Sequence, residues 1–342
     1  MARISLIVKP GAIGDVASVL PAARQLYDSG SRIHWLCGKA AAQLLSCYAW
    51  VRPIVLDDDL LRGKRNAAAI REVLVTWLSL TKNRYDLCAI LQYDRRYRLL
   101  TLPVRARRFI FLERGLRPLH LVSERHHSAE FMRILCGQAD GFREQNIAPA
   151  QPDKLPPNPV PINGAIRVAL APGGARNSLR DDPQRRWPVQ SYVALARLLL
   201  DAGVEVFLTG GPGDLWVEPH FHRLLVQSYV ARWDLPELLA FYNSCHCVVT
   251  HDTGSLHLAG LVGCGVVGLL GPTAPSKALP RRAGALALWG GERLPCRPCY
   301  DGRTFADCPR NECMRSIAPE RVLAAVREVM EQRDAEWRVE SL

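Results

Sequence analysis

The sequence lacks an apolar run long enough to span a bilayer. It also lacks the features of a secretory signal peptide, because residues 1–9 lead directly into a strand-like run without an apolar stretch and a small-residue cleavage site. From these two absences we expect neither a membrane-spanning helix nor a secreted precursor. We therefore expect a cytoplasmic protein.

Acidic residues are outnumbered, with 33 Asp and Glu against 44 Lys and Arg, and the formal net charge is +11. Such a charge favours anionic partners: nucleic acid, acidic lipid headgroups or phosphorylated substrates. No nucleic-acid-binding motif is present, so a nucleic-acid partner is not expected. The arginine clusters at 95–96, 105–108 and 281–282 are either solvated faces or points of membrane contact.

A chain of 342 residues is longer than a single domain with one hydrophobic core usually is. Along it, apolar runs alternate with helical patterns in two series. This alternation predicts two parallel, doubly wound sheets. Prolines crowd the stretch between the two series and predict a semi-rigid linker. We expect an N-terminal Rossmann-like domain over 1–150, a linker over 151–164, a C-terminal domain over 165–317 and a final helix over 318–342 that packs back on the first domain.

The first Gly-containing turn runs from Lys9 through Gly14 to Asp15, between an apolar strand and a helix. Glycine there lets a ligand or another backbone approach closely. A carboxylate at this helix start could take a proton from an acceptor hydroxyl, or it could simply cap the helix. The turn is not G-x-G-x-x-G, which lowers the case for a dinucleotide fingerprint.

Two further turns follow strands of the second series. Gly173 precedes a basic loop with Arg185, and these could bind a diphosphate, or the segment could be an ordinary turn beside a solvated loop. Gly210 and Gly211 suit a nucleoside lying close to the backbone. Asp214 could bond a ribose hydroxyl or cap the next helix.

The fourth segment is Asp252-Thr253-Gly254-Ser255-Leu256-His257, which follows the apolar run 247–250. Small polar residues at a helix start offer free N–H groups and hydroxyls to an anion. His257 falls on the first helical turn and faces the same region, although a lone His is often structural. His251 receives no role.

These four segments, in this order and spacing, resemble glycosyltransferase family 9, the heptosyltransferases of lipopolysaccharide core assembly. The resemblance covers nearly the whole chain, and its most specific part is the segment 252–257 with the following Leu258-Ala259. It implies an α/β protein of GT-B fold, with two Rossmann-like domains whose parallel sheets face each other across a cleft. The donor would bind mainly to the second domain.

By this resemblance, Asp15 corresponds to the general base of an inverting enzyme that needs no catalytic metal. Lys9 and Arg185 correspond to basic positions near the donor phosphates, and Asp252, Thr253, Gly254 and His257 to the donor-binding turn. The family usually has Lys where Arg185 stands, and the loop 180–184 is enlarged.

The implied reaction moves a heptose from ADP-heptose to the anionic inner core of lipopolysaccharide. The enzyme would act as a peripheral protein at the inner face of the inner membrane. One alternative is a related transferase with another nucleotide sugar or a protein acceptor. The other is a non-catalytic nucleotide-binding protein, which the combined presence of Asp15 and the segment 252–257 disfavours.

Four of the eleven cysteines cluster near the C-terminus, within the loop 296–313: Cys296, Cys299, Cys308 and Cys313. This spacing is typical of a metal knuckle and favours a structural zinc or iron ion over free thiols. Similar clusters occur in part of the family, and in related autotransporter heptosyltransferases such a cluster holds iron.

Overall fold

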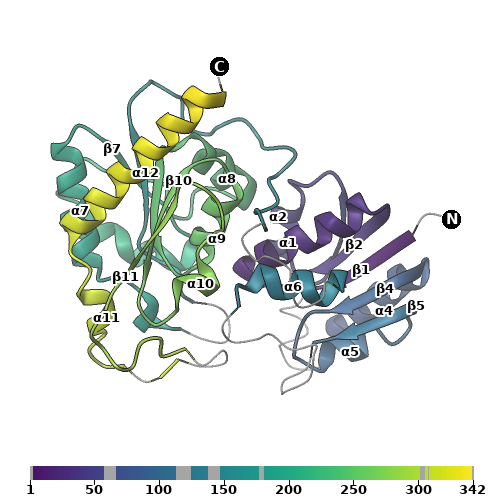
Figure 1. The fold of residues 1–342 in the computed structure, drawn as a ribbon. Helices are drawn as coiled ribbons and strands as arrows, with labels where there is room; N and C mark the ends of the chain where they lie inside the picture. Colours follow the sequence, from purple (N-terminus) through teal and green to yellow (C-terminus); the bar gives the residue numbers. More distant parts are fainter. Residues whose placement is uncertain are drawn as a thin grey trace. The chain divides into compact units, whose positions relative to one another are not determined.

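The fold was examined in a computed structural model, whose elements are labelled in Figure 1. The structure describes residues 3–57, 67–112, 125–137, 147–176, 181–300, 305–306 and 308–340, without the side chains of 333–340. Arg180, at the start of the enlarged loop, lies outside these residues. The chain divides into two compact units, Met1–Lys154 and Leu155–Leu342, so the division falls inside the proline-rich stretch.

The first unit contains a five-stranded sheet of order β3-β2-β1-β4-β5, with every pair parallel. Its strands are β1 (Arg3–Val8), β2 (Ser31–Cys37), β3 (Val51–Val55), β4 (Arg84–Ile90) and β5 (Arg105–Phe111). Its helices are α1 (Ile13–Asp28), α2 (Lys39–Leu45), α4 (Ala67–Thr81), α5 (Arg96–Leu100) and α6 (His127–Cys136). Strands covered by helices on their faces become almost wholly apolar, and the buried runs of β1 and β2 follow this rule.

The second unit contains a six-stranded parallel sheet of order β11-β10-β9-β6-β7-β8. Its strands are β6 (Arg167–Ala171), β7 (Glu205–Leu208), β8 (Gln227–Ser228), β9 (Cys247–His251), β10 (Gly265–Leu270) and β11 (Ala285–Trp289). Its helices are η2 (Pro183–Arg185), α7 (Val189–Asp201), η3 (Pro212–Phe221), α8 (Leu235–Ser244), α9 (Gly254–Leu261), α10 (Pro275–Ala278), α11 (Glu312–Arg315) and α12 (Pro319–Glu340). Both sheets have Rossmann strand order, so the predicted α/β class with two parallel sheets is confirmed.

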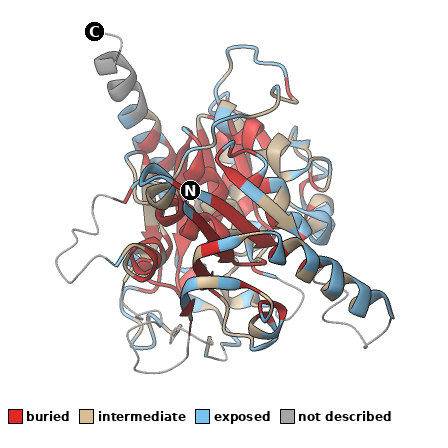
Figure 2. Cartoon of the chain, turned by 90° about the vertical axis from the view of Figure 1, so that its right-hand side faces the viewer, coloured by how far each residue is buried: buried red, intermediate tan, exposed pale blue. Residues whose placement is uncertain are grey.

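The interior of each unit is formed by its central strands, which are buried and red in Figure 2, while most exposed residues lie on the edge strands, helices and loops. In the second unit, α12 packs on α7 and β10. The predicted packing of residues 318–342 on the first unit stays a prediction. Among the described helices, none is both long and apolar enough to cross a membrane.

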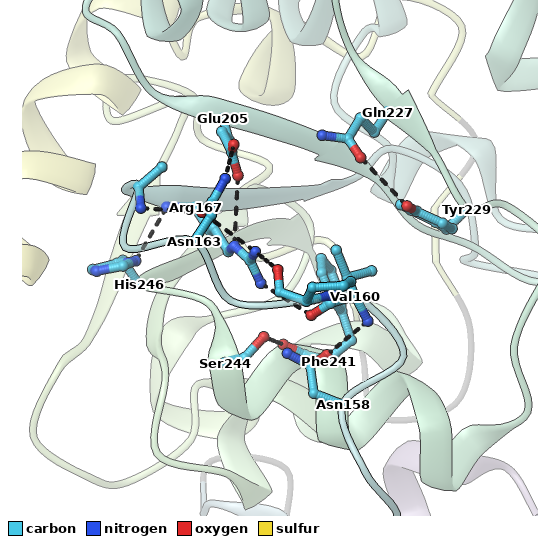
Figure 3. Close-up of polar contacts among 12 residues, drawn as sticks. Asn158, Val160, Asn163, Arg167, Glu205, Gln227, Tyr229, Phe241, Ser244 and His246 are labelled. Atoms are coloured by element: carbon cyan, nitrogen blue, oxygen red, sulfur yellow. Dashed lines mark hydrogen bonds and ion pairs between the residues drawn. The ribbon is translucent and has the colours of Figure 1, made fainter.

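The end of the proline-rich stretch is fixed to the second sheet by Arg167, the buried first residue of β6 (Figure 3). Its guanidinium donates to the carbonyl oxygens of Val160 and Pro161. Its Nε lies 3.5 Å from Oε2 of Glu205, whose Oε1 accepts a hydrogen bond of 2.6 Å from Asn163. Arg167 thus supplies hydrogen-bond donors to the Val160 and Pro161 carbonyls, which lie outside the sheet.

Candidate functional site

Rossmann-like sheets bind ligands at the carboxyl ends of the strands, where the strand order reverses. In the second unit this point lies between β6 and β9. Gly173 follows β6 and Asp252 follows β9, so two of the predicted donor-binding segments meet there. Gly210 and Gly211 follow β7, the next strand on the same edge.

The loops after β6 and β7 are joined by the Asp214 carboxylate. Its Oδ1 accepts from the backbone N–H of Gly174 at 2.7 Å, and its Oδ2 accepts from that of Gly211 at 2.8 Å. A Cβ at Gly173 would lie 2.2 Å from Cγ of Asp214, and one at Gly210 would lie 2.9 Å from its Cβ. The glycines therefore permit a close approach of carboxylate and backbone. The capping alternative for Asp214 matches these contacts, because Gly211 is the residue before η3 and its N–H donates to the carboxylate. A bond from Asp214 to a ribose stays a prediction.

Thr253 joins the loops after β6 and β9. Its hydroxyl accepts the backbone N–H of Ala175 at 3.0 Å, and a Cβ on Gly174, whose φ is +79°, would meet the same hydroxyl. Thr253 is also the N-cap residue of α9, and its side chain makes no cap hydrogen bond. The hydroxyl thus serves the neighbouring loop, while the first turn of α9 presents its backbone N–H groups as helix starts do.

Arg185 and Asp252 form the charged centre of this edge. Nη2 of Arg185 lies 3.2 Å from Oδ1 of Asp252, and Nη1 lies 3.7 Å from Oδ2 of Asp182. The guanidinium carbon also lies 5.4 Å from the ring centre of Phe305. Two carboxylates and an aromatic ring thus hold the guanidinium in place, and only 21% of the Arg185 side chain is exposed.

Asp252 is buried and ionised. Burial alone raises its pKa, but the Arg185 guanidinium, the Thr273 hydroxyl and His257 together lower the pKa of Asp252 to about 2. The Thr273 hydroxyl donates to Oδ2 at 2.6 Å. Charge-assisted bonds of this kind are the stronger ones in proteins. Thr273 was missed in the sequence, although its place just after β10 on the same edge is the signal that would have found it.

His251 is the second residue of this edge that the sequence left without a role. It is fully buried at the end of β9, and its Nδ1 lies 3.1 Å from the Tyr192 hydroxyl. Burial, and then the nearby Arg185 and Arg186, lower the pKa of His251 to about 3. His251 is therefore a neutral packing residue beneath the arginines.

The remaining residues of the segment are half-buried or turned toward the core. Ser255 hydrogen-bonds the buried Tyr242 hydroxyl, which also lies 2.9 Å from the Thr209 hydroxyl. His257 is half-buried on the first turn of α9, close enough to Asp252 to lower its pKa. Donor contacts of Ser255, His257 and Gly254 stay predictions.

The first unit has a smaller polar group at the corresponding point of its own sheet. Lys9 follows β1, and its buried ammonium lies 2.7 Å from Oδ2 of Asp15 and 3.1 Å from Oε1 of Gln92, which follows β4. Gly14 and Asp15 lie in the first turn of α1. The Asp15 side chain is 44% exposed and so can be reached from solvent. Gln92 was also missed in the sequence, since it stands in no motif.

The four C-terminal cysteines line one pocket of about 330 Å³, together with Arg297 and Glu312. Burial raises the pKa of Cys313 to about 11 and also raises that of Cys299. All four are free thiols, but within the described residues no three His, Cys, Asp or Glu side chains are grouped closely enough to hold a metal ion. The donor chemistry suits a metal, yet the arrangement does not fit one, so the predicted structural zinc or iron is not supported.

The residues of this site lie in a segment that is similar to known proteins. Residues 167–307 match the family model of glycosyltransferase family 9 (heptosyltransferase). Lipooligosaccharide heptosyltransferase 2 of Haemophilus influenzae is 30% identical over 124 residues, which are 34% of this chain and 36% of that protein. The matched segment thus spans about a third of the length of the curated relatives.

Solved structures extend the likeness in fold to nearly the whole chain. A family 9 glycosyltransferase of Veillonella parvula has a TM-score of 0.74 at 19% identity, covering 96% of this chain and 97% of its own. Heptosyltransferase WaaC of E. coli with ADP has a TM-score of 0.70 at 18% identity, with coverages of 95% and 99%. The iron-containing dodecameric glycosyltransferase TibC of enterotoxigenic E. coli has a TM-score of 0.59 at 14% identity, and the match covers 96% of this chain and 76% of TibC. The chain therefore has the GT-B fold, and residues 167–307 of its second unit match the family model of glycosyltransferase family 9 (heptosyltransferase).

Proposed function

We propose that the protein transfers a heptose from ADP-heptose to the inner core of lipopolysaccharide. The observation that carries this proposal is the coincidence of two independent results. The family 9 match covers residues 167–307, and the Arg185–Asp252 centre lies inside that range at the ligand-binding edge of the sheet. A solved relative of the same fold contains ADP, which supports an ADP-linked donor.

The donor's diphosphate would bind at the edge formed by the loops after β6 and β9. The Arg185 guanidinium presents a planar fork of donors that suits phosphate oxygens. The start of α9 adds backbone N–H groups and the positive end of the helix dipole. Asp252 and Asp182 fix the direction of the guanidinium before the donor arrives, so little rearrangement is needed when the diphosphate departs.

Asp15 would act as the general base. Its carboxylate accepts the proton of the acceptor hydroxyl while that oxygen forms a bond to the anomeric carbon of the heptose. The bond between the anomeric carbon and the diphosphate oxygen breaks on the opposite face, ADP leaves with the electron pair, and the configuration inverts. Lys9 orients the carboxylate through its 2.7 Å contact with Oδ2, and the exposure of Asp15 leaves it accessible to an acceptor.

The cationic side chains of this chain would carry the charge of the leaving group, so the proposed reaction needs no catalytic metal. The net charge of +11 suits a phosphorylated, anionic acceptor. Such an acceptor is made at a membrane, and we place the protein in the cytoplasm as a peripheral partner of that membrane.

The test is an incubation of the protein with ADP-heptose and a panel of acceptors: a heptose-deficient inner core, the same core already carrying one heptose, and a protein acceptor. Release of ADP together with a mass gain of one heptose on a core acceptor is the expected result. Transfer to the protein acceptor alone would replace our acceptor. Transfer only from another nucleotide sugar, offered to the same acceptors in a parallel incubation, would replace our donor. A protein that binds ADP but transfers nothing to any acceptor would support the non-catalytic alternative.

A further inference from the structure

Helix α4 in the first unit is apolar on both of its faces. Val73, Thr76, Trp77 and Leu80 turn inward, and Trp77 and Val73 pack on the core of the first sheet. The outer face carries Ile70, Leu74 and Leu78 at a spacing of four residues, with Val75 beside them. These four side chains are 60%, 50%, 67% and 54% exposed, respectively. A helix with apolar side chains on both faces is normally covered on both, by protein or by lipid.

The exposed apolar surface continues onto the neighbouring elements. α5 contacts α4, and residues of α4, α5 and β5 share one core cluster, so these elements lie on the same side of the sheet. Leu99, Leu102 and Phe109 add side chains that are 61%, 67% and 40% exposed. We call these seven residues the α4 patch: Ile70, Leu74, Val75, Leu78, Leu99, Leu102 and Phe109. Isolated exposed apolar residues are common, but a contiguous group of this kind marks an interaction surface.

The surroundings of the α4 patch are strongly basic. Residues 67–112 contain nine Lys and Arg against three Asp and Glu. The exposed ones include Arg71 on α4, Arg95 before α5, and Arg105, Arg107 and Arg108 on β5. β5 is an edge strand, where charged residues also prevent pairing with other chains. That role explains the arginines of β5 but not the apolar face of α4.

We propose that the α4 patch is a membrane-docking surface, whose apolar side chains enter the interfacial region of a bilayer while the surrounding arginines contact anionic lipid headgroups. Apolar anchors combined with a basic rim are what a peripheral protein needs for stable binding to anionic membranes. A second copy of the chain suits the patch poorly, because a two-fold interface would set one basic rim against another.

The test measures co-sedimentation of the full-length protein with vesicles of phosphatidylglycerol and phosphatidylethanolamine, and with vesicles of phosphatidylcholine alone. No nucleotide sugar or acceptor is present, so the result does not depend on the proposed reaction. The triple variant Ile70→Ser, Leu74→Ser, Leu78→Ser should bind the anionic vesicles at least about tenfold more weakly. The matched control is Ile162→Ser with Leu225→Ser, which removes exposed apolar side chains (71% and 91%) from the second unit and should bind like the wild type.

Charge is tested separately with Arg105→Gln and Arg108→Gln, against Arg223→Gln and Arg232→Gln in the second unit. The first pair should weaken binding and reduce its salt dependence, and the second pair should not. Circular dichroism confirms that each variant is folded. Wild-type protein that ignores anionic vesicles, or a triple variant that binds them as the wild type does, would overturn the proposal. So would a wild-type dimer that the triple variant abolishes without any vesicle binding, which would assign the patch to a second copy.

Discussion

Nη2 of Arg185 lies 3.2 Å from Oδ1 of Asp252, so a guanidinium from the loop after β6 is fixed at the carboxyl end of β9. The pair brings together two segments that are far apart in the sequence and are each unremarkable alone. It also fixes a cation beside the start of α9, where an anion would gain both from the charge and from the helix dipole.

Replacing Arg185 should weaken nucleotide binding. Arg185→Met removes the cation and keeps much of the volume, and the affinity for ADP should fall by about tenfold to a hundredfold, the loss of one or two charge-assisted bonds. Arg185→Lys keeps the charge and should lose less, because a point charge still attracts phosphate. Isothermal titration with ADP measures both. Equal affinity of Arg185→Met and wild type would remove Arg185 from the donor site.

Stability should fall as the solution is made acidic, in two windows. The pKa of His251 is lowered from 6.5 to about 3, so below pH 6.5 the unfolded chain binds a proton that the folded protein refuses. The free energy of unfolding should therefore fall by about 3 kcal/mol between pH 6.5 and pH 4. The pKa of Asp252 is lowered from 3.8 to about 2, so its contribution of about 2 kcal/mol is present above pH 3.8 and is lost as the pH falls toward 2.

Denaturant unfolding of wild type and His251→Gln at several pH values separates the two windows. The variant should show a flatter dependence between pH 6.5 and pH 4 and the same loss below pH 4. His222→Gln, at an exposed position, serves as the control and should leave the profile unchanged. If the free energy of unfolding of His251→Gln depends on pH as strongly as that of the wild type, His251 is protonated in the folded protein and this explanation is wrong.

Gly173→Ala should destabilise the second unit. The new Cβ would lie 2.2 Å from Cγ of Asp214, and the carboxylate that must shift is bonded to two backbone N–H groups. We expect a loss of about 2 kcal/mol in the free energy of unfolding. Gly213→Ala in the same region has nothing within 4 Å of the new Cβ and is the matched control. Equal stability of the two variants would contradict this, because it would mean that Asp214 and its loop can move away from the new Cβ at little cost.

Thr273→Val should cost about 1 kcal/mol of stability, since the Asp252 carboxylate loses its 2.6 Å hydrogen bond while volume is conserved. The pKa of Asp252 should rise toward its ordinary value, so the loss of stability below pH 3.8 should be smaller and should end at a higher pH. Thr273→Ser restores the hydroxyl and should recover most of both effects. If Val and Ser behave alike, the hydroxyl is not what stabilises the carboxylate.

The sequence predicted the elements with strong periodicity. The helical pattern of residues 189–201 forms α7, and the apolar run 247–250 forms β9, which is one residue longer. β11 was not expected, because its short run, Ala285–Trp289, consists mostly of Ala and Leu, which do not distinguish a strand from a helix. The final helix, expected over 318–342, is α12, over Pro319–Glu340. The third strand, Val51–Val55, includes a proline, which an edge strand tolerates.

The candidate site was harder to predict in detail than in place. Strand-to-helix turns located Gly173, Gly210 and Asp252, because carboxyl ends of parallel strands share an edge. No pattern shows that Asp214 bonds the loop after β6, or that Thr273 holds Asp252, since these contacts join residues distant in sequence. The cysteine spacing predicted a metal site, but spacing alone does not set how the four thiols converge.

The most direct test of the account is the rate of heptose transfer from ADP-heptose to the inner-core acceptor by wild type and by Asp15→Asn, with ADP affinity measured on both. The carboxamide keeps the shape of the side chain but cannot take the proton. The account predicts transfer by the wild type, a kcat lowered by about a hundredfold or more in Asp15→Asn, and an unchanged Kd for ADP. Full activity of Asp15→Asn, or a wild type that neither binds ADP nor transfers heptose, would contradict it.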